Sequence, residues 1–324
     1  ESGRVVMKMV EKQIRPSQIM TREALENTIT LLSAIGGSLN ALIHLPALAA
    51  ELGISLDWDD FSKITTATPV LCSIVPNGNR TVVDLHYAGG IPAVMKELES
   101  VMNKDVLTVT GETLGQILER TSQGDREVIK SMDDPVSRAD GIQVLYGNLA
   151  PQGALVKTSA VPMEVRRFKG TARVFEGEDE CYAAFRAKEI KEGDAVIVRY
   201  EGPKGGPGMK ELHRITEIIK GIPNTAVITD GRFSGASGGL SIGYLCPEAA
   251  EGGPIALVKD GDRITVDFGL ADLEGYPAER LIFDITDKAE IENIQKICSG
   301  GVFTKLEKPP PGRSPIYRIS FNNG

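Results

Sequence analysis

Two glycine-dense loops within residues 200–251 carry the side chains with the greatest chemical potential in this chain. The first loop reads YEGPKGGPGMKE and the second TDGRFSGASGG, and backbone N–H groups in such loops can face an anion. The serine of the second loop follows a strand-like run, so its hydroxyl can be presented to a cleft. Together the loops gather Glu201, Glu211, Asp230, Arg232 and Ser234. The sequence therefore predicts a functional site built from both loops.

Short apolar runs position both loops. Residues 195–200 and 226–229 are rich in β-branched side chains, which predicts buried strands that stop where the glycines begin. Glu211 is expected in the first turn of a helix over 209–220. The alternative interpretation is that both loops are ordinary tight turns. Either loop alone is compatible with that alternative, whereas the ordered pair is more specific.

Composition limits the class of protein. The chain has 324 residues, of which 41% are hydrophobic and 25% charged, with 35 glycines, as expected for a soluble globular α/β protein of about two domains. A net charge of −8, a pI near 5.2 and scattered basic residues argue against a nucleic-acid surface. There is neither an apolar stretch of membrane-spanning length nor a signal-peptide pattern, so we expect a cytoplasmic protein without a membrane partner.

The cysteines and histidines do not have the spacing of metal ligands. Cys72, Cys181, Cys246 and Cys298 form no CxxC pair, which favours free and mostly buried thiols over disulfides. The three histidines are far apart, so a zinc site has few candidate ligands. His44 is interpreted as a core histidine.

The first part of the chain predicts alternating helices and strands. Helices are expected over 1–14, from the N-cap Thr21 to Gly36, and over 39–52 behind Ser38, the last deeply buried and kinked or broken at Pro46. Asp57 and its acidic neighbours indicate a solvated helix start. The remaining expected elements are strands at 69–75 and 106–110, a helix entered at Gly89-Gly90, and a helix over 112–120. The pattern predicts an α/β layered domain whose sheet is incomplete.

The second part predicts a β-rich, barrel-like domain. We divide the chain into an N-terminal domain at 1–124, a linker at 125–141, a β-rich domain at 142–288 and a divergent tail at 289–324. The expected strands are 143–146, 154–157, 170–175, 195–200, 226–229, 255–258 and 263–267, with a helix over 179–188.

Several blocks resemble one known family in the same order. EGPKGGPGMKE, TDGRFSG and PEAAEGGPIALVKDGD are similar to the C-terminal signature blocks of the dihydroxy-acid and sugar-acid dehydratases. YGNLAPQGALVKTSAV and the segment from IRPSQIM to AAELG extend the resemblance over roughly residues 1–267. The stretch GGIPAV resembles the dihydroxy-acid branch more than the phosphogluconate branch. The resemblance implies an α/β fold, in which a partial α/β/α layered domain precedes a swivelling β/β/α barrel-like domain.

The resemblance also implies an activity. Enzymes of this family remove water from a 2,3-dihydroxy carboxylate to leave a 2-keto acid, as in branched-chain amino-acid biosynthesis, with Mg²⁺ and an iron–sulfur cluster, [2Fe-2S] or [4Fe-4S]. Ser234 in TDGRFSG matches the family's proton-accepting serine, and Glu211 in GPGMKE matches a Mg²⁺ ligand. A small-molecule dihydroxy acid is the expected substrate, and a homodimer the expected assembly.

Parts of the family pattern are absent from this sequence. The cluster cysteines, together with an aspartate and a carbamylated lysine that bind Mg²⁺, belong to motifs upstream of the resemblance, and none of the four cysteines matches them. We therefore expect a fragment or a truncated homologue that does not itself ligate the cluster. The alternatives are a sugar-acid dehydratase, an inactive homologue that acts only as a binding protein, or another metal-dependent lyase or decarboxylase.

Overall fold

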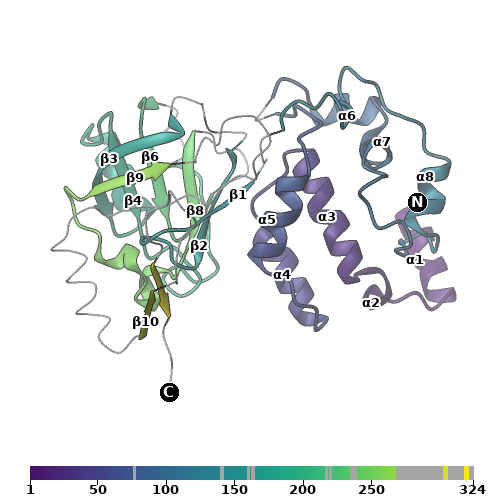
Figure 1. Ribbon diagram of the computed structural model, residues 1–324, viewed down its shortest axis with the longest axis horizontal. Helices are drawn as coiled ribbons and strands as arrows, with labels where there is room; N and C mark the ends of the chain where they lie inside the picture. The colour runs from purple at the N-terminus through teal and green to yellow at the C-terminus, as the bar shows by residue number, and fades with distance from the viewer. Residues whose placement is uncertain are drawn as a thin grey trace. The chain divides into compact units, whose positions relative to one another are not determined.

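The chain folds into two compact units, one built from helices and one built around a sheet (Figure 1). The computed structural model describes residues 1–75, 78–138, 142–158, 161, 165–215, 218, 221–233 and 239–267, and the backbone of two short strands near the end. Unit 1 comprises Glu1–Gln143 with Lys157–Ser159, and unit 2 comprises Val144–Val156 with Ala160–Gly324. No helix in these described stretches is long and apolar enough to cross a bilayer.

Unit 1 consists of eight helices in its described residues. They are α1 (Ser2–Glu11), α2 (Pro16–Ile19), α3 (Arg22–Ala34), α4 (Ala41–Glu51), α5 (Trp58–Ala67), α6 (Val82–Tyr87), α7 (Gly90–Glu97) and α8 (Leu114–Glu119). A buried cluster that includes Leu71, Leu98, Leu118 and Ile129 forms the core of this unit. Most of these helices match the predicted ones to within a few residues.

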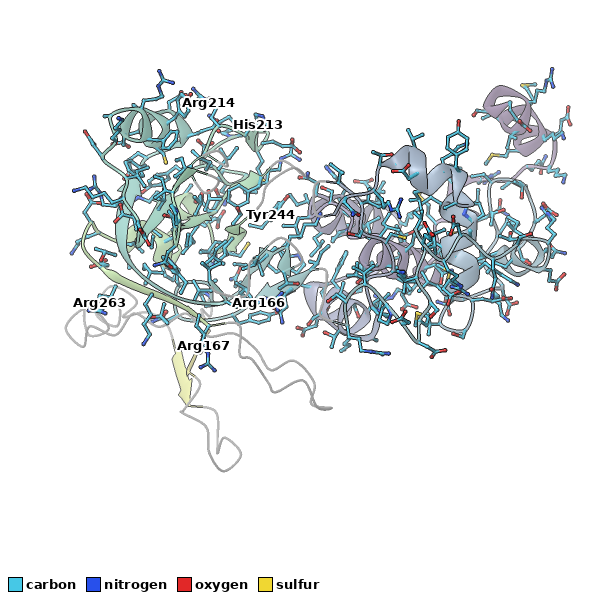
Figure 2. The ribbon with its side chains drawn as sticks, turned by 90° about the horizontal axis from the view of Figure 1, so that it is seen from above. Arg166, Arg167, His213, Arg214, Tyr244 and Arg263 are labelled. Carbon is cyan, nitrogen blue, oxygen red and sulfur yellow. The ribbon has the colours of Figure 1, made fainter. Side chains whose placement is uncertain are left out.

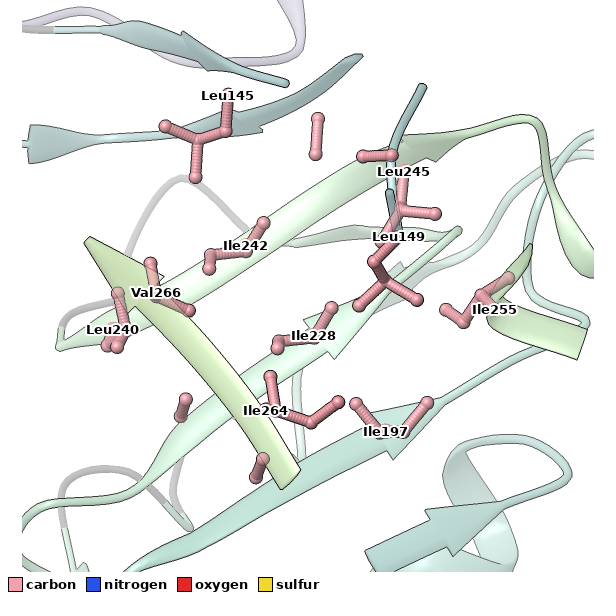
Figure 3. Packing of buried hydrophobic residues seen from close by; sticks show 14 of the residues in the cluster. Leu145, Leu149, Ile197, Ile228, Leu240, Ile242, Leu245, Ile255, Ile264 and Val266 are labelled. Atoms are coloured by element: carbon pink, nitrogen blue, oxygen red, sulfur yellow. The ribbon is translucent and has the colours of Figure 1, made fainter. Parts of the chain in front are cut away.

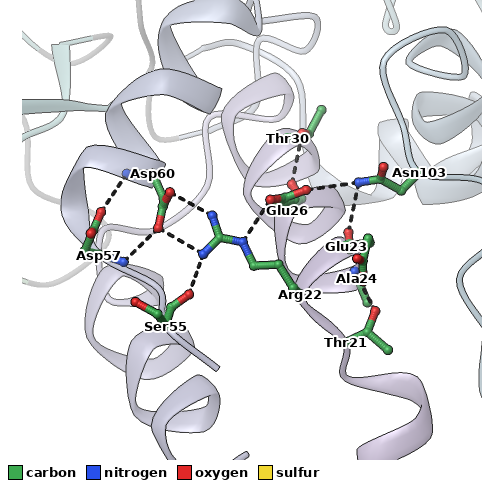
Figure 4. Close-up of polar contacts among 10 residues, drawn as sticks. All are labelled: Thr21, Arg22, Glu23, Ala24, Glu26, Thr30, Ser55, Asp57, Asp60 and Asn103. Carbon is green, nitrogen blue, oxygen red and sulfur yellow. Dashed lines mark hydrogen bonds and ion pairs between the residues drawn. The ribbon is translucent and has the colours of Figure 1, made fainter. Parts of the chain in front are cut away.

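Side-chain caps fix where two helices of unit 1 begin. The Thr21 hydroxyl accepts the Ala24 N–H, and Asp57 forms a reciprocal capping box with Asp60 at the start of α5, so both predicted starts are confirmed. Arg22 joins α3 to α5 because its guanidinium reaches Glu26 at 2.8 Å and Asp60 at 2.7 Å (Figure 4). Hydrogen bonding from Arg22 holds the pKa of the Asp60 carboxyl below its usual range.

The prediction for α4 is partly wrong. The helix begins after Asn40 rather than Ser38, runs through Pro46 without a break, and buries only Leu42 and Ala49. His44 is exposed and is not a core residue. An apolar composition shows that a helix can be buried on several sides, but burial also requires a neighbouring element over each side.

The two strands predicted in unit 1 are also wrong. In place of the strand at 69–75 the structure has two isolated bridges, Val70 with Ser137 and Ile74 with Arg80, and in place of the strand at 106–110 it has one, Leu107 with Thr113. A β-branched run becomes a strand only when a second extended segment offers its backbone over several residues. The described residues of unit 1 provide single contacts instead.

Unit 2 is organised around a mixed seven-stranded sheet in the order β1-β2-β8-β6-β4-β3-β9. Its strands are β1 (Gln143–Leu145), β2 (Gly153–Val156), β3 (Arg167–Phe175), β4 (Asp194–Val198), β6 (Ala226–Thr229), β8 (Leu240–Cys246) and β9 (Arg263–Asp267). The four central strands, β3, β4, β6 and β8, are all parallel to one another. On one side β9 pairs antiparallel with β3, and on the other side β2 pairs antiparallel with β8. The α/β fold class is confirmed.

Alternating side chains fill both faces of this sheet. Ile197, Ile228 and Ile242 point into one buried cluster, which is the core of unit 2 (Figure 3). Val196 and Val227 point to the opposite face, where α9 (Glu178–Arg186) and a small two-stranded sheet cover them. The small sheet pairs β5 (Glu211–Leu212) with β7 (Arg232–Phe233).

Three predictions in unit 2 are corrected by the structure. Residues 255–258 fall largely in a short 3-10 helix, η4 (Pro254–Leu257), rather than in a strand. Strand β8 was not predicted, although it lies between β2 and β6 in the sheet. Met209 to Arg214 are not helical, since Glu211 and Leu212 form β5. Within the tail only the backbone of β10 (Val302–Lys305) and β11 (Tyr317–Ser320) is described, as an antiparallel pair.

Candidate functional site

Asp230 anchors the first glycine loop to the end of β6. Its carboxylate is 1% exposed and accepts three backbone N–H groups, from Tyr200 at 3.1 Å, Glu201 at 3.0 Å and Ala249 at 2.8 Å. Burial raises the pKa of the Asp230 carboxyl, while the three N–H donors act in the opposite direction. The chain therefore uses a buried carboxylate to fix the point where the loop leaves β4.

A second buried carboxylate holds the middle of the same loop. Glu248 is 6% exposed and accepts the N–H groups of Lys204 at 2.8 Å and Gly205 at 3.0 Å. Gly202 lies against it so closely that an added Cβ would be 2.4 Å from Glu248 Oε2. The sequence suggested that N–H groups of this loop could face a bound anion. Those of Lys204 and Gly205 are instead bound by the protein itself.

A pair of buried glutamates ties both ends of the first glycine loop to α9. Glu201 Oε1 accepts the N–H of Glu178 at 2.8 Å, and Glu178 Oε1 accepts the N–H of Arg214 at 2.9 Å. Lys210 Nζ lies 3.5 Å from Glu201 Oε1 and 3.7 Å from Glu178 Oε2. Lys210 immediately precedes Glu211 in the chain and neutralises part of the charge of both carboxylates.

Glu211 is an exposed residue of β5, directly opposite Arg232 of β7. The Arg232 guanidinium also donates a hydrogen bond to the carbonyl oxygen of Met209, which holds the strand from its other end. The predicted helical placement of Glu211 fails because the pairing partner lies about twenty residues further along the chain. The structure nevertheless brings the two loops together, through this pair of strands.

Tyr244 belongs to the same region and was missed from the sequence. It lies on β8 and is labelled in Figure 2. Its φ of 55° is uncommon for a non-glycine residue, and its N–H donates to the Gly231 carbonyl at 2.8 Å. Burial raises the pKa of the phenol, the charge of Glu211 raises it further, and the charge of Arg232 lowers it. The Tyr244 ring therefore lies within electrostatic range of both β5 and β7. The sequence signal was an aromatic residue between two glycine-containing runs.

Ser234 lies outside the described residues. Its neighbour Phe233 is 3% exposed and packs in the cluster beneath β5 and β7. Glu211 faces Arg232 in the backbone register, two positions before Ser234 in the sequence. The approach of the Ser234 hydroxyl to the Glu211 carboxylate therefore stays a prediction.

Two family models match consecutive parts of the chain. The dihydroxy-acid/6-phosphogluconate dehydratase N-terminal model matches residues 1–117, and the dihydroxy-acid/6-phosphogluconate dehydratase C-terminal model matches residues 127–282. The chain belongs to this dehydratase family. The recognised family and the order of its two parts agree with the sequence blocks described above.

Curated relatives of the chain carry the name dihydroxy-acid dehydratase. One from Moorella thermoacetica is 49% identical over 279 residues, which cover 85% of this chain and 50% of the relative. One from Ruminiclostridium cellulolyticum is 46% identical over 296 residues, covering 90% and 52%, and one from Ignicoccus hospitalis is 49% identical over 271 residues, covering 82% and 49%. The chain spans about half the length of the curated relatives that it matches.

The side chains of the chain fit the two cofactors implied by the family resemblance unequally. Glu211 is an exposed carboxylate and suits one position around Mg²⁺, although no group of three or more potential ligands occurs among the described residues. Cys72, Cys181 and Cys246 are free, and burial raises the pKa of their thiols to about 11, about 12 and about 11. Protonated thiols that are not grouped do not fit an iron–sulfur cluster.

Proposed function

We propose that this chain supplies the catalytic base and one magnesium ligand of a dihydroxy-acid dehydratase, which converts 2,3-dihydroxy carboxylates to 2-keto acids. The β5–β7 pair is the observation that carries the proposal, because it joins the loop of Glu211 to the loop that continues into Ser234. Family membership and the names of the relatives support the reaction class. Branched-chain amino-acid biosynthesis is the proposed setting.

The proposed reaction breaks two bonds of the substrate. Ser234 accepts the proton from C2, the hydroxyl leaves C3, and the resulting enol tautomerises to the 2-keto acid. A serine is a weak base unless positive charge stabilises its alkoxide. Mg²⁺, when bound, would supply such charge. Glu211 would hold the Mg²⁺, while Asp230 and Glu248 fix the loop that positions Glu211.

The proposal extends to the organisation of the protein. Residues 1–124 belong to an N-terminal domain and residues 142–288 to a C-terminal domain, joined by the linker at 125–141. The cluster ligands and the other Mg²⁺ ligands are proposed to come from motifs that this sequence does not contain. We propose a cytoplasmic homodimer as the working form.

The test is formation of 2-keto acid by the protein that contains this chain together with the motifs supplying the other cofactor ligands. A 2,3-dihydroxy branched-chain acid is expected to be dehydrated faster than a sugar acid. Ser234→Ala is expected to abolish turnover and to leave the Mg²⁺ and iron content unchanged, whereas Ser100→Ala, at an exposed position, changes neither. Turnover that survives Ser234→Ala contradicts the assignment of the base. A preference for sugar acids selects the other branch, and loaded protein without any turnover supports an inactive binding protein.

A further inference from the structure

Arg199, the residue directly after β4, binds the segment 247–258, which contains the 3-10 helix η4. Its guanidinium nitrogen Nη1 donates to three carbonyl oxygens of this segment, those of Ile255 at 3.2 Å, Ala256 at 2.7 Å and Val258 at 3.1 Å. Carbonyl groups at the end of a short helix have no following turn to donate to them, and a basic side chain can take that place. Arg199 therefore caps η4 from the end of a strand.

The other guanidinium nitrogens of Arg199 bind a carboxylate at the end of β3. Nε and Nη2 donate to Glu176 Oε1 at 3.0 Å and 2.5 Å. The backbone N–H of Arg199 donates to the carbonyl oxygen of Phe175, the last residue of β3, at 3.1 Å. A guanidinium is planar, so these contacts also set the direction of Nη1. The end of β3 thereby aims Nη1 at the segment 247–258.

Backbone contacts make the segment 247–258 one folded piece. The Gly253 N–H donates to the Glu248 carbonyl oxygen at 2.9 Å, and the Ala256 N–H donates to the Gly253 carbonyl oxygen at 2.9 Å. A Cβ added at Gly253 would lie 1.9 Å from the carbonyl oxygen of Pro247, so the turn is closely packed. A shift of the carbonyl groups that the guanidinium binds is therefore transmitted to Glu248.

The same segment holds the middle of the first glycine loop. The Glu248 carboxylate accepts the N–H groups of Lys204 and Gly205, at 2.8 Å and 3.0 Å. The loop begins immediately after Arg199 and ends at Glu211. Arg199 therefore fixes the start of the loop relative to the carboxylate that binds its middle. All of these groups belong to unit 2.

We propose that Arg199 is a positioning residue that holds the first glycine loop in the form that binds Mg²⁺. This inference rests on the proposed function, because Glu211 at the end of that loop is the proposed Mg²⁺ ligand. Without the contacts from Nη1, the segment 247–258 can shift together with Glu248, and the loop that Glu248 binds shifts with it. A loop that samples several positions binds Mg²⁺ less tightly, because this cation requires near-ideal ligand geometry and ordering the loop costs free energy.

The test uses the complete protein, in which this chain is joined to the motifs that supply the other cofactor ligands. In Arg199→Met the Lys204 and Gly205 amides are expected to exchange hydrogen at least about tenfold faster than in wild type, because their acceptor is no longer held. Mg²⁺ affinity, measured by equilibrium dialysis where the variant is folded, is expected to fall about threefold or more. This is less than the loss of about tenfold that follows when an outer-shell partner is removed, because Arg199 acts through intervening contacts. Arg199→Lys is expected to give intermediate values, because an ammonium group lacks the planar fork that binds a carboxylate and carbonyl groups at once.

Two control variants isolate the contacts with the carbonyl groups. Glu176→Gln leaves those contacts in place and is expected to keep amide exchange and Mg²⁺ affinity close to wild type. Arg186→Met removes an exposed positive charge at the end of α9 and is expected to change neither measurement. Equal effects of Glu176→Gln and Arg199→Met would assign the effect to the ion pair and overturn the route through the segment 247–258.

The remaining outcomes separate this inference from the proposed function. A folded Arg199→Met protein that melts at a lower temperature but has wild-type amide exchange and Mg²⁺ affinity overturns the inference. If Arg199→Met does not fold, wild-type values of both measurements in Arg199→Lys overturn it. Loss of Mg²⁺ affinity in Glu211→Gln without a loss in Arg199→Met leaves the proposed function standing and removes this inference. The opposite result keeps Arg199 as the residue that positions the loop and removes Glu211 as the ligand.

Discussion

The Asp230 carboxylate accepts the backbone N–H of Glu201 at 3.0 Å, and this contact fastens the first glycine loop to the start of the second. The two residues are far apart in the sequence but lie beyond the ends of adjacent parallel strands, β4 and β6. Parallel strands present their carboxyl ends at the same edge of a sheet, and loops that leave this edge are brought together there. The positions of Glu211 and Arg232 therefore depend on how well this edge is held.

Asp230→Asn is expected to loosen the first loop. Asp230 uses one oxygen for Glu201 and the other for Tyr200 and Ala249, so an amide NH₂ in either orientation faces at least one N–H donor. Removing the buried charge offsets part of this loss. A net destabilisation of about 1–3 kcal/mol is expected from chemical denaturation, because a buried donor loses its acceptor. Hydrogen exchange should show the Glu201 amide less protected.

The control for this substitution is Asp105→Asn. Asp105 is an exposed residue of unit 1, and its change is expected to leave stability within about 0.5 kcal/mol of wild type. An Asp230→Asn protein with unchanged stability and an equally protected Glu201 amide would show that the carboxylate does not hold the loop.

Gly202→Ala is expected to disturb the loop by crowding rather than by loss of a bond. The new Cβ would lie 2.4 Å from Glu248 Oε2 and 2.8 Å from Glu248 Cβ, so the glutamate or the loop must shift. Overpacking of this kind costs about 1–3 kcal/mol. Gly221→Ala is the matched control, because its nearest neighbour, Phe185 Cζ, would be 3.9 Å from the added carbon. Thermal melts of both variants provide the comparison, and equal melting temperatures would contradict the expectation.

Glu211→Gln is expected to weaken Mg²⁺ binding. The substitution keeps the size of the side chain and removes the charge that a hard divalent cation prefers. Affinity should fall at least about tenfold, the lower end of what losing even an outer-shell partner costs. Equilibrium dialysis with Mg²⁺ measures the change, and Glu192→Gln, at another exposed position of unit 2, should bind as wild type does. Equal affinity in both variants would remove Glu211 from the metal site.

The sequence predicts the parts of this site that depend on local patterns, and it misses the parts that depend on contacts between distant segments. The apolar runs that became β4 and β6 and the loops after them were predicted, because a buried strand followed by glycines is a local signal. The same loops already contained Asp230, Glu201 and Glu211. The side chains that hold them, such as Glu178 and Glu248, come from distant segments, and no local pattern indicates which carboxylate turns toward which N–H.

The wrong predictions have the same origin. The sequence predicts Glu211 in the first turn of a helix over 209–220, but pairing of β5 with β7 places it in a strand opposite Arg232. Strand β8 contains Gly243, which weakens its sequence pattern, and Tyr244, whose φ is positive. The strand forms because β2 and β6 both offer backbone partners. Tertiary contacts decided both cases.

The three described cysteines are expected to be poorly reactive in the folded protein. Burial raises the thiol pKa to about 11 for Cys72 and Cys246 and to about 12 for Cys181, so very little thiolate forms near pH 7.5. Because the thiolate is the reactive species, iodoacetamide should modify these positions far more slowly than an unhindered cysteine with a pKa near 8.5. Peptide mass spectrometry checks each site, with labelling in denaturant as the control. Rapid labelling of any of the three in the native state would show that its burial is transient.

Lys157→Met is expected to stabilise the protein near neutral pH. Burial lowers the pKa of Lys157 from 10.5 to about 8, so the folded state releases its proton more readily than the unfolded state. Below pH 8 the folded protein therefore carries a penalty of about 3 kcal/mol for the buried ammonium. Between pH 8 and 10.5 the Lys157 amine is neutral in the folded state and charged in the unfolded state, so the penalty disappears as the pH rises.

The gain in free energy of unfolding from Lys157→Met should accordingly be greatest near pH 7 and small near pH 10.5. Urea denaturation in a buffer free of carboxylate and phosphate measures it, and the difference between variant and wild type cancels the titration of distant groups. Lys169→Met should show no such pH-dependent gain, because Lys169 is exposed. A variant that is less stable at pH 7 would mean that the Lys157 ammonium contributes to the fold and has a protein partner.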